Sequence, residues 1–136
     1  MVEVVNNHRR LRFPRQETLR TVRRVIRGEK RLTDGITVVF VNRYFIRRMN
    51  RKFLKRNYAT DVISFRLEDG LSKGGEIYIN LDRARSQARE YRVSYGEEVN
   101  RLLIHGALHL FGYEDSTKRK RERMRKREEY YLTRLK

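Results

Sequence analysis

The chain has 136 residues, no cysteine and one proline, and its 34 basic residues against 17 acidic ones give a net charge of +17. This length suits one domain, residues 1–136, while the lack of cysteine excludes disulfides and cysteine-ligated zinc. The first residues lack the apolar segment of a signal peptide, and no run approaches the roughly 18 apolar residues of a membrane span. We therefore expect a cytoplasmic protein without a membrane partner.

The excess of positive charge favours a polyanionic partner, because unbalanced charge causes self-repulsion in a folded protein. Surface ion-pair networks of a thermophile would explain many charges of both signs, but not twice as many basic as acidic residues. A basic surface without a specific partner is the other reading. The composition thus points to nucleic acid or the ribosome.

In the first half of the chain we expect two strands and two helices. Residues 2–5 form a short strand, and Pro14 opens a helix to about residue 27 with Leu19, Val22 and Ile26 inward. The β-branched run 36–41 predicts a strand. Asn42 can cap a helix that reaches about Lys55, with Phe45, Met49 and Phe53 on its inner face.

In the second half, residues 61–65 and 76–80 predict strands, and the segment between them, with Gly70, Gly74 and Gly75, predicts a loop. A helix follows over 81–92. Ser94 and Glu97 form a capping box for a helix through Phe111 that is apolar on nearly every side and should be buried. A last helix begins near Ser116. The expected fold is α+β, a mixed α/β domain with a single four-stranded sheet, about five helices and a metzincin-like metal-binding helix in the centre.

The central helix carries two histidines, His105 and His109, four residues apart and hence on one helical face. Gly112 and Asp115 follow at the spacing of the metzincin motif H-x-x-x-H-x-x-G-x-x-ligand, in which the glycine turns the chain back toward the metal. The glutamate that is the general base of H-E-x-x-H proteases is replaced by Gly106. The spacing predicts a metal site made of His105, His109 and Asp115.

One divalent ion suits these ligands, and zinc is the natural choice for two imidazoles, a carboxylate and an open position. Fe(II) fits the same set, and nickel or copper could compete. Other readings stay open. The histidines could be hydrogen-bonded core residues, Asp115 could cap the last helix, and Glu114 could replace it as ligand.

This motif and its surroundings resemble the YbeY family of metal-dependent endoribonucleases in ribosomal RNA maturation. The family signature H-G-x-L-H-L-x-G-Y-D-H is matched by His-Gly-Ala-Leu-His-Leu-Phe-Gly-Tyr over 105–113, with Glu114 and Asp115 in its last two places. A second block, L-N-x-x-Y-R then P-T-D-V-L-S-F, resembles residues 49–54 and 59–65. A third, L-G-D-I-x-I, resembles residues 74–79.

Two positions depart from the family pattern. Its arginine in the second block falls on Leu54, and its third histidine is Asp115. Lys55 and Arg56, beside Leu54, are the basic candidates for the missing charge, although a neighbouring residue on a helix is rotated by about 100°.

Basic residues gather in three places that could bind phosphates without reading sequence. One group precedes the first helix. The positions predicted to bind nucleic acid come from the other two, on the second and last helices: Arg47, Arg48, Arg51, Lys52, Lys55, Arg56, Lys118, Arg119 and Arg123.

The resemblance implies a zinc-dependent, single-strand-specific endoribonuclease that acts in maturation of the small-subunit ribosomal RNA 3′ end and in ribosome quality control. The metal's water would attack the phosphodiester, and no general base can be named. The expected partner is ribosomal RNA in the small subunit, and the expected state is a monomer. Two alternatives remain: a non-catalytic ribosome-binding assembly factor with a structural metal, and a metallopeptidase, which Gly106 and the charge disfavour.

Overall fold

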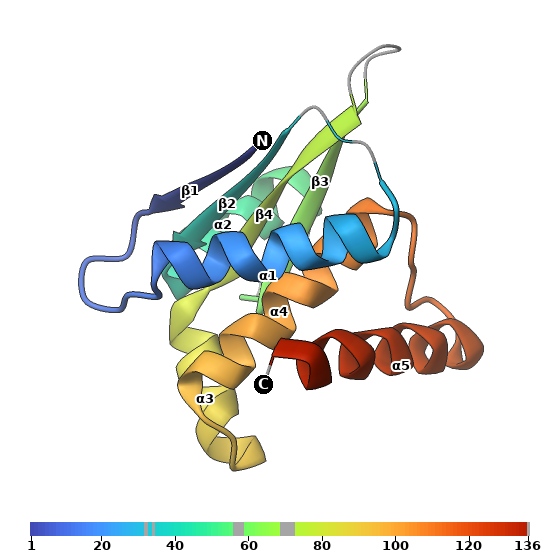
Figure 1. Cartoon of the computed structure of the whole chain (residues 1–136). Helices are drawn as coiled ribbons and strands as arrows, with labels where there is room; N and C mark the ends of the chain where they lie inside the picture. Colours follow the sequence, from blue (N-terminus) through green and yellow to red (C-terminus); the bar gives the residue numbers. More distant parts are fainter. Residues whose placement is uncertain (32, 34, 56–58, 69–72, 136) are drawn as a thin grey trace.

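A computed structural model describes residues 1–31, 33, 35–55, 59–68 and 73–135. Within them lie four strands and five helices, coloured along the sequence in Figure 1. In chain order they are β1 (Val2–Asn6), α1 (Arg15–Gly28), β2 (Gly35–Val41), α2 (Arg43–Phe53), β3 (Val62–Glu68), β4 (Lys73–Asn80), α3 (Leu81–Tyr91), α4 (Tyr95–Leu110) and α5 (Lys118–Leu135). The expected α+β fold, with one four-stranded sheet and five helices, is confirmed.

The strands form one mixed sheet in the order β1-β2-β4-β3. The first three run parallel, with Val4 beside Val38 and Val38 beside Ile77. β3 pairs antiparallel with β4 at the edge, where Ser64 lies beside Ile77. This edge strand faces the end of α4, and it forms part of the site described below.

Helices cover both faces of the sheet. α2 packs on one face through Ile46 and Met49, against Val39, Val41 and Ile63. The larger core lies on the other face, where α1 and α4 cross in front of the strands in Figure 1. α4 contacts β3, β4 and the three helices α1, α3 and α5. Its burial at the centre of the fold was predicted from its apolar surface and is confirmed.

Two sequence predictions about apolar and glycine positions are wrong. Gly74 and Gly75 lie inside β4 and not in a loop, because their missing side chains allow close packing. A Cβ on Gly75 would come within 2.5 Å of Leu110 Cδ2 on α4. Phe53 is 57% exposed and not inward, because α2 ends there beside the edge strand, where the Phe53 ring meets the Phe65 ring edge-to-face. The predicted loop residue Gly70 lies outside the described residues.

Among the described residues, no helix is both long enough and apolar enough to cross a membrane.

Candidate metal centre

The end of α4 turns the chain back onto the histidine face. The amide of Gly112 donates to the His109 carbonyl at 3.1 Å, and the amide of Tyr113 donates to the Leu108 carbonyl at 3.0 Å. This pair of bonds is a Schellman motif, which needs a left-handed residue, and Gly112 has φ +97°. The turn places Asp115 Oδ2 3.6 Å from His109 Nε2 and 4.0 Å from His105 Nε2.

These three side chains are a group whose ligand atoms all lie within 4.8 Å of one another. Zinc bonds of 2.0–2.1 Å in a tetrahedron put neighbouring ligand atoms about 3.3 Å apart, and the separations of 3.6 and 4.0 Å between Asp115 Oδ2 and the two Nε2 atoms lie close to this value. Burial and the nearby His105 hold the pKa of His109 below its ordinary value of 6.5, despite the opposing effect of Asp115. A neutral imidazole is the form that binds metal. The residues fit a single divalent ion.

His105 is oriented by a carboxylate that the sequence analysis did not single out. Glu128, buried on α5, has Oε2 2.9 Å from His105 Nδ1. The ionised carboxylate accepts a hydrogen bond from Nδ1–H, which leaves the Nε2 lone pair directed toward His109 and Asp115. Metal-ligating histidines commonly have such a partner. The arrangement therefore prepares His105 as a ligand.

A network of charged and polar side chains lies behind Glu128. Arg101 Nη1 is 3.6 Å from Glu128 Oε1, and Arg101 Nε donates to Glu98 Oε1 at 2.9 Å. Gln87 in turn donates to Glu98 at 2.8 Å and to Asp61 at 3.3 Å. Since each of these buried or half-buried groups has a partner, the network restrains the positions of Glu128 and Asp61.

Gly106, which stands where a protease has its glutamate, lies where α4 crosses the sheet. A Cβ there would be 2.6 Å from Ile77 Cγ2, and Ser64 Oγ donates to the Gly106 carbonyl at 2.9 Å. A glutamate at this position would collide with β4. The close contact between helix and sheet therefore excludes the protease general base on steric grounds.

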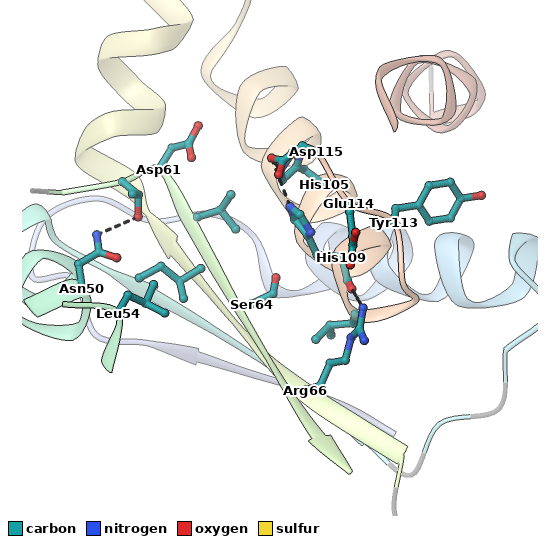
Figure 2. Close-up of a pocket in the computed structure, with 14 residues that line it drawn as sticks. Asn50, Leu54, Asp61, Ser64, Arg66, His105, His109, Tyr113, Glu114 and Asp115 are labelled. Atoms are coloured by element: carbon teal, nitrogen blue, oxygen red, sulfur yellow. Dashed lines mark hydrogen bonds and ion pairs between the residues drawn. The ribbon is translucent and has the colours of Figure 1, made fainter. Parts of the chain in front are cut away.

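The three candidate ligands line a cleft of about 540 Å³ between α4, β3 and the end of α2. In Figure 2, Asn50, Leu54 and Asp61 lie on one side and the two histidines on the other, with Ser64 on β3 between them. Arg66 lies at the far end of the cleft, where its guanidinium donates to the His109 carbonyl at 3.1 Å. The cleft thus contains a cation that the sequence analysis missed.

Most of the other predicted positions can be located. Leu54 lines the cleft and is 40% exposed. Lys55 is exposed with φ +53° and is not among the residues lining the cleft, and Arg56 lies outside the described residues. The rest are exposed on two helices: Arg47, Arg48, Arg51 and Lys52 on α2, and Lys118, Arg119 and Arg123 on α5.

Asp115 and Glu114 have different surroundings. Thr117 Oγ1, and not Asp115, accepts from the Lys120 amide and caps α5. Glu114 is paired with Lys120 at 2.9 Å, a contact that lowers the pKa of this exposed carboxylate. It is not part of the three-residue group. Asp115 is therefore the carboxylate placed to act as third ligand.

Three residues near the candidate site were not predicted from the sequence, because the sequence pattern marks them only weakly: Glu128, Ser64 and Arg66. Glu128 is the only acid on the buried face of α5, whose other members are Met124, Tyr131 and Leu132. Ser64 and Arg66 alternate with Ile63 and Phe65, which pack toward α2, so that the period of two places the polar pair on the cleft side.

Similarity to known proteins agrees with this geometry. A family model described as Endoribonuclease YbeY matches residues 3–136. A protein of Chlorobium phaeobacteroides named Endoribonuclease YbeY is 38% identical over 134 residues, which are 98% of this chain and 96% of that protein. One of Chlorobium limicola with the same name is 43% identical over 115 residues, 85% of this chain and 80% of the relative.

The fold has a solved counterpart in the solution structure of TM1509 from Thermotoga maritima. The two superpose with a TM-score of 0.67 over 99% of this chain and 89% of that one, at 22% identity. At this identity the likeness concerns the fold alone. The family model and the curated relatives show that the chain belongs to the YbeY endoribonuclease family.

Proposed function

We propose that the protein is a zinc-dependent endoribonuclease that cuts single-stranded regions of ribosomal RNA. The observation that carries this proposal is the group of His105, His109 and Asp115 in a cleft beside basic helices. When bound, a zinc ion supplies Lewis-acid chemistry, because it lowers the pKa of a water molecule and polarises a phosphoryl oxygen. Family membership supports RNA as the substrate.

The chain's own groups would position the RNA. Arg66 uses one of its five N–H donors on the His109 carbonyl, which fixes the guanidinium at the rim of the cleft and leaves further donors for a phosphate. This cation stabilises the added negative charge of the transition state. Leu54, at the place of the family's arginine, supplies only apolar surface, so Arg66 is the described cation that lines the cleft.

Basic residues on both sides of the cleft would hold the strand. α2 ends in the cleft and carries Arg47, Arg48, Arg51 and Lys52, while Lys118, Arg119 and Arg123 lie near the start of α5, shortly after Asp115. Such contacts bind phosphates without sequence preference. We further propose that the protein acts as a monomer in the cytoplasm on the small ribosomal subunit, in RNA 3′-end maturation and quality control, as the family resemblance implies.

The test is cleavage of ribosomal RNA by the wild-type chain, by His109→Ala and by chelator-treated protein. We expect cutting by the wild type only, with recovery when zinc is returned to the chelated sample. Cutting that survives both changes would refute the metallonuclease. RNA binding without any metal-dependent cutting would favour the assembly-factor alternative, which Leu54 in the cleft makes a specific competitor.

A further inference from the structure

A second basic cavity lies away from the metal ligands, where β1 and β2 end and α2 and α3 begin. It has a volume of about 360 Å³ and is lined by His8, Arg9, Arg10, Arg43, Tyr44 and Arg85, together with Leu11, Asn42 and Asp82. None of these residues lines the metal cleft. The residues that line it belong to the turn after β1 and to the first turns of α2 and α3, and Figure 1 shows the course of these backbone segments.

His8 gives this cavity a fixed wall. Its Nδ1 accepts the amides of Arg10 and Leu11 at 3.1 and 3.0 Å, so the ring proton is on Nε2, which lies 3.0 Å from Asp82 Oδ1. The Arg12 guanidinium donates to the His8 carbonyl at 3.1 Å. The His8 ring is buried, and its hydrogen bonds to the Arg10 and Leu11 amides tie it to the loop that carries Arg9 and Arg10.

The cavity carries an excess of positive charge. Arg9, Arg10, Arg43 and Arg85 line it, and within the described part of the chain no carboxylate lies within 4.0 Å of their guanidinium groups. The one acid, Asp82, uses its oxygens on His8 and on the Arg43 amide. The first turns of α2 and α3 are capped by Asn42 and Asn80, so attraction for an anion comes from the guanidinium groups.

α2 connects this cavity with the metal cleft. Arg43 lines the cavity, whereas Asn50 and Leu54 line the cleft. The spacing of Arg43, Arg47, Asn50 and Leu54 is that of one side of a helix, so the exposed Arg47 lies on the line between the two sites. The rise of 1.5 Å per residue separates Arg43 from Leu54 by about 16 Å, which about five stacked nucleotides would span at 3.4 Å each.

We propose that the cavity is a second phosphate-binding site for the RNA strand, reached along α2 from the metal cleft. This inference rests on the proposed function, from which RNA is taken as the ligand. Arg9, Arg10, Arg43 and Arg85 bind backbone phosphate, and the exposed ring of Tyr44, 4.9 Å from the Arg43 guanidinium, offers a face for a base.

The test is binding of a fluorescent 12-nucleotide single-stranded RNA, measured by anisotropy with chelator present so that the strand stays intact. The variants are Arg43→Gln/Arg85→Gln and, as an independent pair, Arg9→Gln/Arg10→Gln. The matched control is Arg23→Gln/Arg24→Gln, which removes the same charge from the exposed side of α1. Circular dichroism confirms that each variant is folded.

For single strands, the logarithm of the binding constant falls with the logarithm of the salt concentration by about 0.7 for each neutralised phosphate. Each phosphate contact that a variant loses should therefore weaken binding about fivefold at 0.1 M salt and make this slope shallower by about 0.7. The control pair should bind less than twofold more weakly than the wild type. Unchanged affinity in both cavity pairs, an equal weakening in the control, or no binding by the wild type would overturn the inference. This experiment measures binding and not cleavage. The nuclease proposal is tested by the cutting assay, so the two proposals can fail independently.

Discussion

The two ring nitrogens of His105 face different carboxylates. One contact orients the ring, and the other nitrogen stays available to bind a metal. Nδ1 meets Glu128 at 2.9 Å, while Nε2 lies 4.0 Å from Asp115 Oδ2. The buried carboxylate keeps a proton on Nδ1 and so keeps the Nε2 lone pair available. Glu128 is a positioning residue, because it acts through His105.

The variant Glu128→Gln should therefore weaken zinc binding. Removal of the charge makes His105 a poorer ligand and leaves Arg101 without its second partner, and partners of this kind change metal affinity by about 10- to 100-fold. Competition against a chromophoric chelator measures the affinity. Glu129→Gln, on the adjacent exposed position of α5, is the matched control and should keep wild-type affinity. Equal affinities in both variants would contradict the role of Glu128.

Much of the site at this scale follows from local sequence. The two histidines, the capping Ser94 and the turn at Gly112 are set by spacing and backbone preference, and each is found as predicted; Ser94 accepts from the Glu97 amide at 3.0 Å. Glu128 and Arg66 could not be assigned in the same way. They come from α5 and β3, and only packing of these elements against α4 brings them to the histidines.

At the scale of helices and strands, the place where α4 crosses the sheet determines which residue can lie next to His105. Gly106 contributes no side chain, so the helix lies close to Ile77 and Ser64. The same contact explains why the glycines in β4 were wrongly predicted to form a loop: a side chain on Gly75 would strike Leu110 of α4. A glycine in the sequence can mark either a turn or a place where two backbone elements pack closely, and the neighbouring residues do not distinguish the two.

Gly106→Ala should destabilise the fold. Its Cβ would be 2.6 Å from Ile77 Cγ2, and overpacking of this kind costs about 1–3 kcal/mol, which exceeds the gain of up to about 1 kcal/mol from helix propensity. Gly96→Ala on the same helix is the control, because its Cβ would meet only Phe13 at 3.8 Å. Urea unfolding should show a smaller free energy of unfolding for the first variant and no decrease for the second. A Gly106→Ala protein as stable as the wild type would refute the close contact.

A buried carboxylate joins α1, the ligand loop and α5. Glu29, at the end of α1, accepts hydrogen bonds from Tyr113 at 2.8 Å, from Arg127 at 2.7 Å and from the Tyr131 hydroxyl. Burial raises the pKa of Glu29, but these three donors outweigh it and hold the pKa below its ordinary value of 4.5. Because Tyr113 is two residues from Asp115, Glu29 also restrains the loop that carries the proposed third ligand.

This lowered pKa predicts how stability depends on pH. The ionised Glu29 stabilises the fold fully above pH 4.5, and that contribution disappears as the pH falls through the lower folded pKa. At pH 7, Glu29→Gln should cost about 1–3 kcal/mol of unfolding free energy, and the difference from wild type should shrink below pH 4.5. Exposed Glu90→Gln should change stability by less than about 0.5 kcal/mol. A difference that stays constant down to pH 3 would contradict this account of Glu29.

Across the whole molecule, a net charge of +17 is combined with a cleft that two histidines and Asp115 line. The composition indicates a polyanionic partner, and the spacing of the histidines indicates a metal site. The sequence does not show that the basic helix α2 and the histidines lie together. They do so because of the topology, since α2 reaches the cleft only where β3 returns antiparallel at the sheet edge. That the chain folds as one domain and acts as a monomer remains a prediction.

The most direct test of the central claim is a zinc titration of the metal-free wild-type chain, in which bound zinc and the initial rate of RNA cutting are measured in the same samples. We predict that no cutting occurs without metal and that both signals rise together and saturate at one zinc per chain, while an Asp115→Ala sample saturates later and cuts more slowly. Cutting at full rate without bound metal, or full occupancy without cutting, would contradict the claim that His105, His109 and Asp115 form the catalytic metal site.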